Sequence, residues 1–313
     1  MKQRVAVVVG VVLALACAWF VGARLAQDWP EARDAVTGAS AGWLVLAVVL
    51  AATGMTTIAV GWQAVLAALG HRRPLRTVIP WYYAGEIGKY LPGGLWPIVG
   101  RGELARRGGV PRGAAYSGVA LSLGLLYLAA AMVACALLPF ALDELGGPLA
   151  AVLVLPPLGL LCLHPVVSGR VVALAGRLLK RPLEVRVPGF AEALGLVARY
   201  LPVWLLIGGA TWSFARALDP DAGLARIVLA TAVAWLAGFL AVPVPGGVGV
   251  REAVFVALAG DLGPGVAVST AVLARVAFVA VDAAGAVLSA RVAPRRPSST
   301  AAGTAPPAPR TIG

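Results

Sequence analysis

Long apolar runs recur along the whole chain and constrain its fold more than any other feature. Of the 313 residues, 60% are hydrophobic and 13% are charged. A transmembrane helix needs about 20 mostly apolar residues. The chain offers six candidates, at residues 5–24, 41–67, 113–140, 148–164, 200–218 and 265–290. These runs predict an all-α integral membrane protein with one polytopic domain over residues 1–292. Residues 5–24 also fit a signal peptide, but without a clean cleavage site they favour a retained first span.

The charges between the apolar runs predict which ends face the cytoplasm. Lys and Arg gather before residue 5, at 72–76, 101–112, 170–186 and 291–296. The connections near residues 28–34, 143–144, 219–221 and 261 are acidic or nearly free of Lys and Arg. Basic loops stay on the cytoplasmic side, so we expect the cytoplasmic (inner) membrane with both termini inside. Anionic lipid explains the net charge of +12 better than nucleic acid, for which the chain has no motif.

Two further stretches, 77–100 and about 225–260, contain Pro-Gly-Gly turns instead of an unbroken apolar helix. Arginines flank the first stretch on both sides, whereas the second lies between the acidic loops "DPDAG" and "GDLG". We therefore expect two re-entrant hairpins, the first entering from the cytoplasm and the second from outside. Their broken backbone must face protein or a wet cavity, because lipid cannot satisfy it. The alternative is that these stretches cross the membrane, which gives eight spans.

The two stretches also share a motif, which is Ala-Gly, six residues and Pro-Gly-Gly, followed by an Arg and a Glu. It starts at Ala84 in the first copy and at Ala237 in the second. The motif predicts an inverted repeat of two halves, at about 41–140 and 200–290, each built as span, hairpin and span. Gly/Pro-interrupted segments at matching positions of inverted halves point to a substrate site near the bilayer midplane.

Charged residues and turn glycines at hairpin depth are the candidate substrate-binding residues, because charge inside a membrane is costly. They are Glu86, Lys89, Pro92, Gly93, Gly94, Arg101, Glu103, Pro245, Gly246, Gly247, Arg251 and Glu252. Glu86 and Lys89, three residues apart, share a helix face and can pair with each other or hold a headgroup. The arginine forks and the turn N–H groups suit phosphate. Each arginine can instead pair with the glutamate that follows it and brace its hairpin.

Other segments support a membrane protein without catalytic chemistry. Arg275 and Asp282, seven residues apart in the last span, are expected to pair or make a polar contact inside the bundle, with a proton relay as the alternative. The basic stretch 166–186 is predicted to be an amphipathic linker on the cytoplasmic lipid surface, and residues 293–313 a disordered tail. The sequence contains no hydrolase, metalloprotease or nucleotide-binding motif and no metal-ligand spacing of its three cysteines. We therefore expect neither an enzyme nor a cofactor.

The segments "GKYLPGGLWPIVGRGELARRGG" and "VPVPGGVGVREAVFVALAG" resemble the membrane region of the lysylphosphatidylglycerol synthase/flippase family. The resemblance covers most of residues 1–292. In bifunctional members this region is implicated in moving aminoacylated phospholipid between leaflets, and a separate cytoplasmic domain makes that lipid.

The resemblance implies a stand-alone translocating part, a lipid flippase or scramblase, because a short Pro-rich tail stands where the synthase would follow. Its partners would be membrane lipids: anionic or aminoacylated phospholipid, or a polyprenyl-linked lipid. The alternative is a non-transporting accessory protein that presents lipid to a separate synthase or glycosyltransferase.

Overall fold

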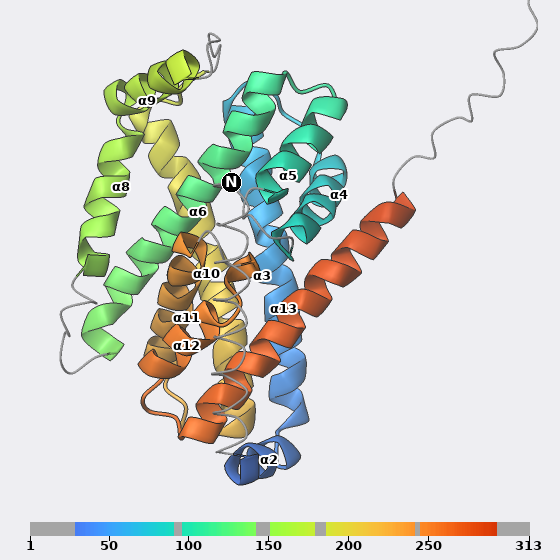
Figure 1. Ribbon diagram of the computed structural model, residues 1–313, viewed down its shortest axis with the longest axis vertical. Helices are drawn as coiled ribbons and strands as arrows, with labels where there is room; N and C mark the ends of the chain where they lie inside the picture. The colour runs from blue at the N-terminus through green and yellow to red at the C-terminus, as the bar shows by residue number, and fades with distance from the viewer. Residues whose placement is uncertain (1–28, 91–95, 142–150, 179–185, 242–244, 293–313) are drawn as a thin grey trace, which may run out of the picture.

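The computed structural model describes residues 29–90, 96–141, 151–178, 186–241 and 245–292, and all regular secondary structure in these ranges is helical (Figure 1). The elements are α2 (Trp29–Thr37), α3 (Ala41–Ala68), α4 (Leu75–Glu86), η1 (Ile87–Tyr90), α5 (Trp96–Arg107), α6 (Arg112–Ala141), η2 (Ala151–Val154), α8 (Leu155–Leu163), α9 (Pro165–Leu178), α10 (Phe190–Leu218), α11 (Leu224–Leu240), η3 (Pro245–Gly247), α12 (Val250–Leu258) and α13 (Pro264–Val292). The predicted all-α fold is confirmed.

Four helices, α3, α6, α10 and α13, are long and apolar enough to cross a membrane, and they confirm four of the six predicted spans. Helix α10 begins at Phe190 rather than near residue 200. Of the predicted span 148–164, the structure describes η2 and the short α8, and α8 together with the start of α9 forms a pair bent by 78° that is a candidate for one broken span. The bend falls at His164, whose extended backbone (ψ 131°) is typical of a residue before proline. The predicted span 5–24 and the predicted tail 293–313 lie outside the described residues.

Helices α3 and α10 form the centre of the core and pack closely along each other. Small residues on α3 make this approach possible: a Cβ on Gly54 would lie 3.0 Å from Ile207 Cγ1, and one on Gly61 would lie 2.5 Å from the Tyr200 ring. The buried Tyr200 hydroxyl shares a 2.7 Å hydrogen bond with Ser122 Oγ of α6. The crossing of α3, α6 and α10 is therefore fixed by close backbone contact and by a satisfied buried hydrogen bond.

Two helical hairpins lie between the long helices and point toward each other. Helices α4 and α5 occupy the upper half of the molecule in Figure 1, and α11 and α12 the lower half. Arg73 Nη2, before the first hairpin, donates a 2.9 Å hydrogen bond to Gly109 O after it. Arg226 Nη1 at the start of the second lies 2.6 Å from Asp261 Oδ1 at its end. Each hairpin thus returns to the end from which it starts, whereas the eight-span alternative would separate these residues by the membrane thickness.

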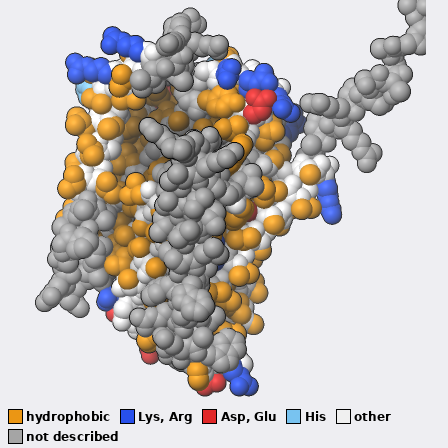
Figure 2. All heavy atoms as spheres, viewed as in Figure 1, with side chains coloured by type: hydrophobic (Ala, Val, Ile, Leu, Met, Phe, Trp, Pro, Cys, Tyr) orange, Lys and Arg blue, Asp and Glu red, His pale blue; other side chains and the backbone are white. Residues whose placement is uncertain are grey.

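The surface separates an apolar flank from charged ends. Figure 2 shows orange side chains along the flank and blue ones gathered at the upper end, with mixed charges at the lower end. The upper end carries Arg72, Arg73, Arg76, Arg106, Arg107, Arg112, Arg170 and Arg177. Large exposed apolar residues on the flanks include Val45, Val48, Leu161, Leu205, Val276 and Leu288. Such an apolar belt between polar ends is what a lipid bilayer requires.

Candidate functional site

The tips of the two hairpins meet inside the bundle, where η1 and η3 are in contact and η1 also touches α13. Gly246 lies at this junction: a Cβ there would be 3.1 Å from Arg275 Nη2 and 3.4 Å from Lys89 O. Gly246, Gly247 and Gly249 all have positive φ angles, between 58° and 82°. Glycine adopts such angles without strain, so the glycines of the predicted turn allow its backbone conformation. The first turn, with Pro92, Gly93 and Gly94, lies outside the described residues.

The first hairpin is held to α13 by a buried ionic cluster. Lys89 Nζ lies 2.5 Å from Asp282 Oδ2, and the Tyr90 hydroxyl donates a 2.7 Å hydrogen bond to the same oxygen. Lys89 Nζ also lies 3.4 Å from Glu86 Oε2, so the pair predicted within the hairpin is present. Asp282 is fully buried. One carboxylate of the last span therefore anchors the tip of the first hairpin.

Arg101 lies behind this cluster with no exposed surface. Its Nε is 3.4 Å from Glu86 Oε1, and its guanidinium carbon is 5.5 Å from the Tyr82 ring and 5.7 Å from the Trp62 ring. Gly85 makes room for it, because a Cβ there would lie 2.5 Å from Arg101 Cγ. Charge and aromatic faces thus hold the guanidinium, although none of its nitrogens makes a hydrogen bond to the described residues.

Glu103 takes no part in this cluster. Its carboxylate accepts hydrogen bonds of 2.8 Å from Arg106 and Arg107 at the outer end of α5. These hydrogen bonds lower the pKa of the Glu103 carboxyl to about 2, and the bond from Arg106 contributes most. The pairing of Arg101 with Glu103 is absent because residues two apart on a helix do not face each other.

In the second hairpin, Arg251 and Glu252 also have separate partners. The Arg251 guanidinium carbon lies 3.6 Å from the centre of the Trp235 ring, and a Cβ on Gly238 would be 2.5 Å from Arg251 Cγ. Glu252 Oε2 accepts a hydrogen bond from the Gly249 N–H, and Oε1 lies 3.8 Å from Arg275 Nη1. Neighbouring residues on a helix point about 100° apart, which explains why no Arg251–Glu252 pair forms.

Arg275 anchors the second hairpin to α13, since its Nη1 also donates a 3.1 Å hydrogen bond to Gly246 O. Arg275 and Asp282 thus make the polar contacts predicted inside the bundle, but to different hairpins. Arg275, Asp282, Tyr90 and Trp235 were not among the predicted site residues. A charge within an otherwise apolar span was the available signal for Arg275 and Asp282.

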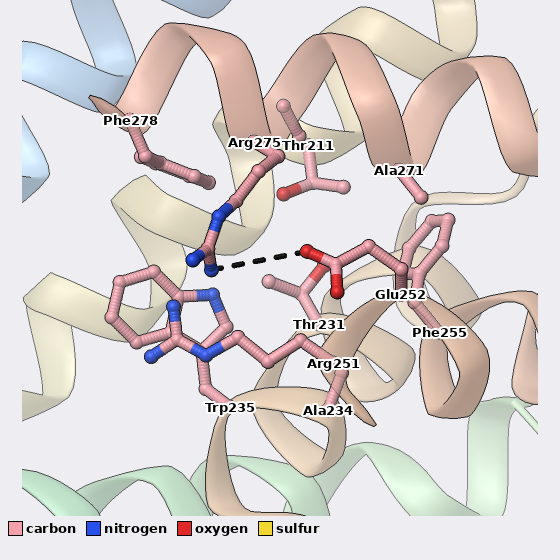
Figure 3. A pocket seen from close by; sticks show the side chains of 11 residues that line it. Thr211, Thr231, Ala234, Trp235, Arg251, Glu252, Phe255, Ala271, Arg275 and Phe278 are labelled. Atoms are coloured by element: carbon pink, nitrogen blue, oxygen red, sulfur yellow. Dashed lines mark ion pairs between the residues drawn. The ribbon is translucent and has the colours of Figure 1, made fainter. Parts of the chain in front are cut away.

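A cavity of about 40 Å³ lies between α10, α11, α12 and α13, next to the second hairpin (Figure 3). Its lining comprises Thr211, Thr231, Ala234, Trp235, Arg251, Glu252, Phe255, Ala271, Ala274, Arg275 and Phe278. Two guanidinium groups and one carboxylate face it among aromatic and small apolar side chains. Such an arrangement can bind an anion next to an apolar group.

The fold and the ionic cluster define a multi-pass helical membrane protein in which two hairpins meet around buried charges. The chain matches the family model described as the lysylphosphatidylglycerol synthase TM region over residues 7–285, and it belongs to this family. The resemblance inferred from the hairpin motifs is therefore confirmed. A comparison with curated proteins found no match. Family membership associates the chain with a lipid-related function at the membrane, through the transmembrane part of the family.

Proposed function

We propose that the protein is a lipid translocase that moves a phospholipid, or another phosphate-bearing lipid, between the leaflets of the cytoplasmic membrane. The observation that carries this proposal is the meeting of two opposed hairpins at a buried ionic cluster beside α13. Charged side chains inside an apolar bundle are functional candidates, because burying a charge in a membrane protein is costly. The basic end would face the cytoplasm.

The helix contacts fit the inverted repeat predicted from the sequence, and such a repeat would support this function. In this repeat α3 corresponds to α10, the first hairpin to the second, and α6 to α13, so that α4 corresponds to α11. The contact of α6 with α11 in one arrangement then corresponds to the contact of α13 with α4. Both contacts exist, and α3 packs on its own counterpart α10. The close approaches of Gly85 to Arg101 and of Gly238 to Arg251 correspond in the same way. Such halves can exchange an inward-open and an outward-open arrangement around a central site.

In this proposal the headgroup passes between the hairpin tips while its acyl or prenyl chains stay in lipid. Lys89 belongs to η1, where the first hairpin meets the second, and its ammonium group contacts both Glu86 and Asp282. A lipid phosphate can replace Glu86 at the ammonium group of Lys89, because Glu86 keeps Arg101 as an ionic partner at 3.4 Å. The tips can then part on one side while the headgroup keeps Lys89 neutralised.

Leaflet exchange in proteoliposomes tests the proposal, with labelled phosphatidylglycerol, its lysylated form and a polyprenyl phosphate sugar as separate cargoes. We expect exchange of at least one cargo above empty liposomes. We expect the exchange rate to fall by about tenfold or more in Lys89→Gln, which removes the ammonium charge between the hairpins. Arg170→Ala, on the exposed surface of α9, is the matched control and should retain exchange.

Absence of exchange for all three lipids, with wild-type protein that remains folded, would contradict translocation. It would favour the accessory role, in which the protein presents lipid to a separate synthase or glycosyltransferase. Capture of lipid without exchange, measured on the same preparations, would be the signature of that role.

A further inference from the structure

We propose that the cavity beside the second hairpin is a binding site for the phosphodiester of an anionic lipid headgroup, with Arg251 and Arg275 as its two anion-binding residues. The identification of the ligand as cargo rests on the proposed translocase function. The site itself rests on the charges, the geometry and the chemistry of the cavity wall.

The cavity wall carries an excess of positive charge. It contains two arginines, Arg251 and Arg275, against the single carboxylate of Glu252. Within the described part of the chain, no carboxylate lies at ion-pair distance from Arg251. Glu252 Oε1 lies 3.8 Å from Arg275 Nη1, which is near the upper limit of an ion pair. Its Oε2 accepts a hydrogen bond from the Gly249 N–H. An uncompensated charge away from water is costly, so an anionic ligand would be stabilised here.

The two hairpins differ at the position that would neutralise this charge. The glycine that makes room for the arginine is followed by Glu86 in the first hairpin and by Phe239 in the second. Glu86 lies 3.4 Å from Arg101 and compensates its charge. The repeat thus supplies a built-in carboxylate for Arg101 and an apolar ring where Arg251 would need one. The counter-anion of Arg251 is therefore left to a ligand.

Arg251 and Arg275 are the charged hydrogen-bond donors among the described residues that line the cavity. Figure 3 shows Arg275 from α13 and Arg251 from α12 reaching into the same region, with Trp235 beneath the Arg251 guanidinium. The hydroxyls of Thr211 and Thr231 donate to backbone carbonyls of their own helices. Two guanidinium forks from different helices can bind a phosphodiester between them.

The remaining wall favours a lipid phosphate over free phosphate. Trp235, Phe255 and Phe278 offer apolar surface beside the two arginines, which suits the glycerol and first methylenes of a lipid. The net positive wall also selects by charge. A headgroup that carries an added amino group, as in a lysylated lipid, would bring a second cation to the arginines, so we expect it to bind more weakly than phosphatidylglycerol.

The test is a binding titration of the purified full chain in detergent, read as the ligand-induced rise in thermal unfolding midpoint. The probes are short-chain phosphatidylglycerol, its lysylated form, short-chain phosphatidylcholine and inorganic phosphate. We expect phosphatidylglycerol to bind most tightly. Arg251→Gln and Arg275→Gln should each weaken it by about tenfold or more, since each removes a charged hydrogen-bonding fork.

Three further variants complete the experiment. Glu252→Gln should bind phosphatidylglycerol more tightly, because it removes the competing carboxylate at nearly constant volume. Arg251→Lys, which keeps the charge without the fork, should fold and bind with intermediate affinity. Arg170→Gln on the α9 surface should bind as wild type does.

Unchanged phosphatidylglycerol affinity in both Gln variants would overturn the site. Equal affinity for inorganic phosphate would overturn its assignment to a lipid, and equal affinity for the lysylated lipid would overturn its charge selectivity. Failure of the site and failure of the translocase are distinguishable. Binding that depends on Arg251 and Arg275, without leaflet exchange, would leave the site and contradict translocation. Leaflet exchange by wild type, together with unchanged phosphatidylglycerol affinity in both Gln variants, would contradict the site and leave translocation supported.

Discussion

At the residue scale, Asp282 is expected to contribute more to stability than any exposed acidic residue. It is fully buried and binds both Lys89 and Tyr90, while its Oδ1 has no hydrogen-bond partner among the residues that the structure describes. Asp282→Asn keeps the shape and removes the charge, which leaves Lys89 with Glu86 alone. Loss of one partner of a buried pair costs about 3 kcal/mol, and we expect a loss of this order in the free energy of unfolding measured in detergent.

Asp261→Asn is the matched control for that measurement. Asp261 pairs with Arg226 at 2.6 Å, but its side chain is 49% exposed. Solvent screens such pairs, so the loss should stay below about 1 kcal/mol. If both variants lost equal stability, the anchoring of the first hairpin by Asp282 would be contradicted.

Glu103 gives a prediction for pH at the same scale. Hydrogen bonds from Arg106 and then Arg107 lower the pKa of its carboxyl from 4.5 to about 2 in the folded protein. Because the pKa is lower in the folded protein, the ionised Glu103 stabilises the fold at pH values above its pKa in the unfolded chain. This stabilisation is lost as the pH falls toward 2. The difference in thermal midpoint between wild type and Glu103→Gln should therefore stay constant from about pH 6 to 8 and shrink below about pH 4. A difference that grows on acidification would contradict these bonds.

At the scale of the helices, each hairpin depends on a glycine that lets its two arms meet. A Cβ on Gly85 would lie 2.5 Å from Arg101 Cγ and 2.8 Å from the Arg101 backbone nitrogen, so α4 and α5 would have to separate. Overpacking of this kind costs about 1–3 kcal/mol. We expect Gly85→Ala to lower the thermal midpoint and to reduce leaflet exchange.

Gly124→Ala provides the comparison, because Gly124 lies in α6 with no atom within 4 Å of its would-be Cβ. Alanine favours a helix more than glycine does, so this variant should be neutral or slightly stabilising. A similar loss in both variants would show that the effect belongs to helix propensity and not to the contact between hairpin arms.

At the scale of the whole molecule, the charge asymmetry of the two ends predicts the orientation in the membrane. Arg107 is exposed after the first hairpin and Asp221 is exposed before the second. In a background with all cysteines replaced, Asp221→Cys should react with an impermeant thiol reagent added to intact cells. Arg107→Cys should react only after the membrane is opened. Labelling of both positions from one side would contradict the opposed hairpins.

The sequence by itself determined features that depend on neighbours along the chain. Length and apolarity predicted the four long helices. The Pro-Gly-Gly motifs predicted two hairpins, and the charges that flank them predicted their opposite directions. The pair of Glu86 and Lys89 was predictable as well, because residues three apart on one helix meet through local geometry. The predicted span 148–164 ends where the chain breaks before Pro165, but its apolarity did not predict that α8 and the start of α9 form a bent pair.

Only the tertiary structure decided which charges meet across helices. Sequence proximity suggested pairing Arg101 with Glu103 and Arg251 with Glu252, but helical geometry turns these neighbours apart. Their actual surroundings come from elsewhere: Glu86 for Arg101, Trp235 for Arg251 and Arg275 for Glu252. These partners depend on how α4, α11 and α13 cross the hairpins. Apolar periodicity shows that helices pack, but it does not specify the register at which their few charges face each other.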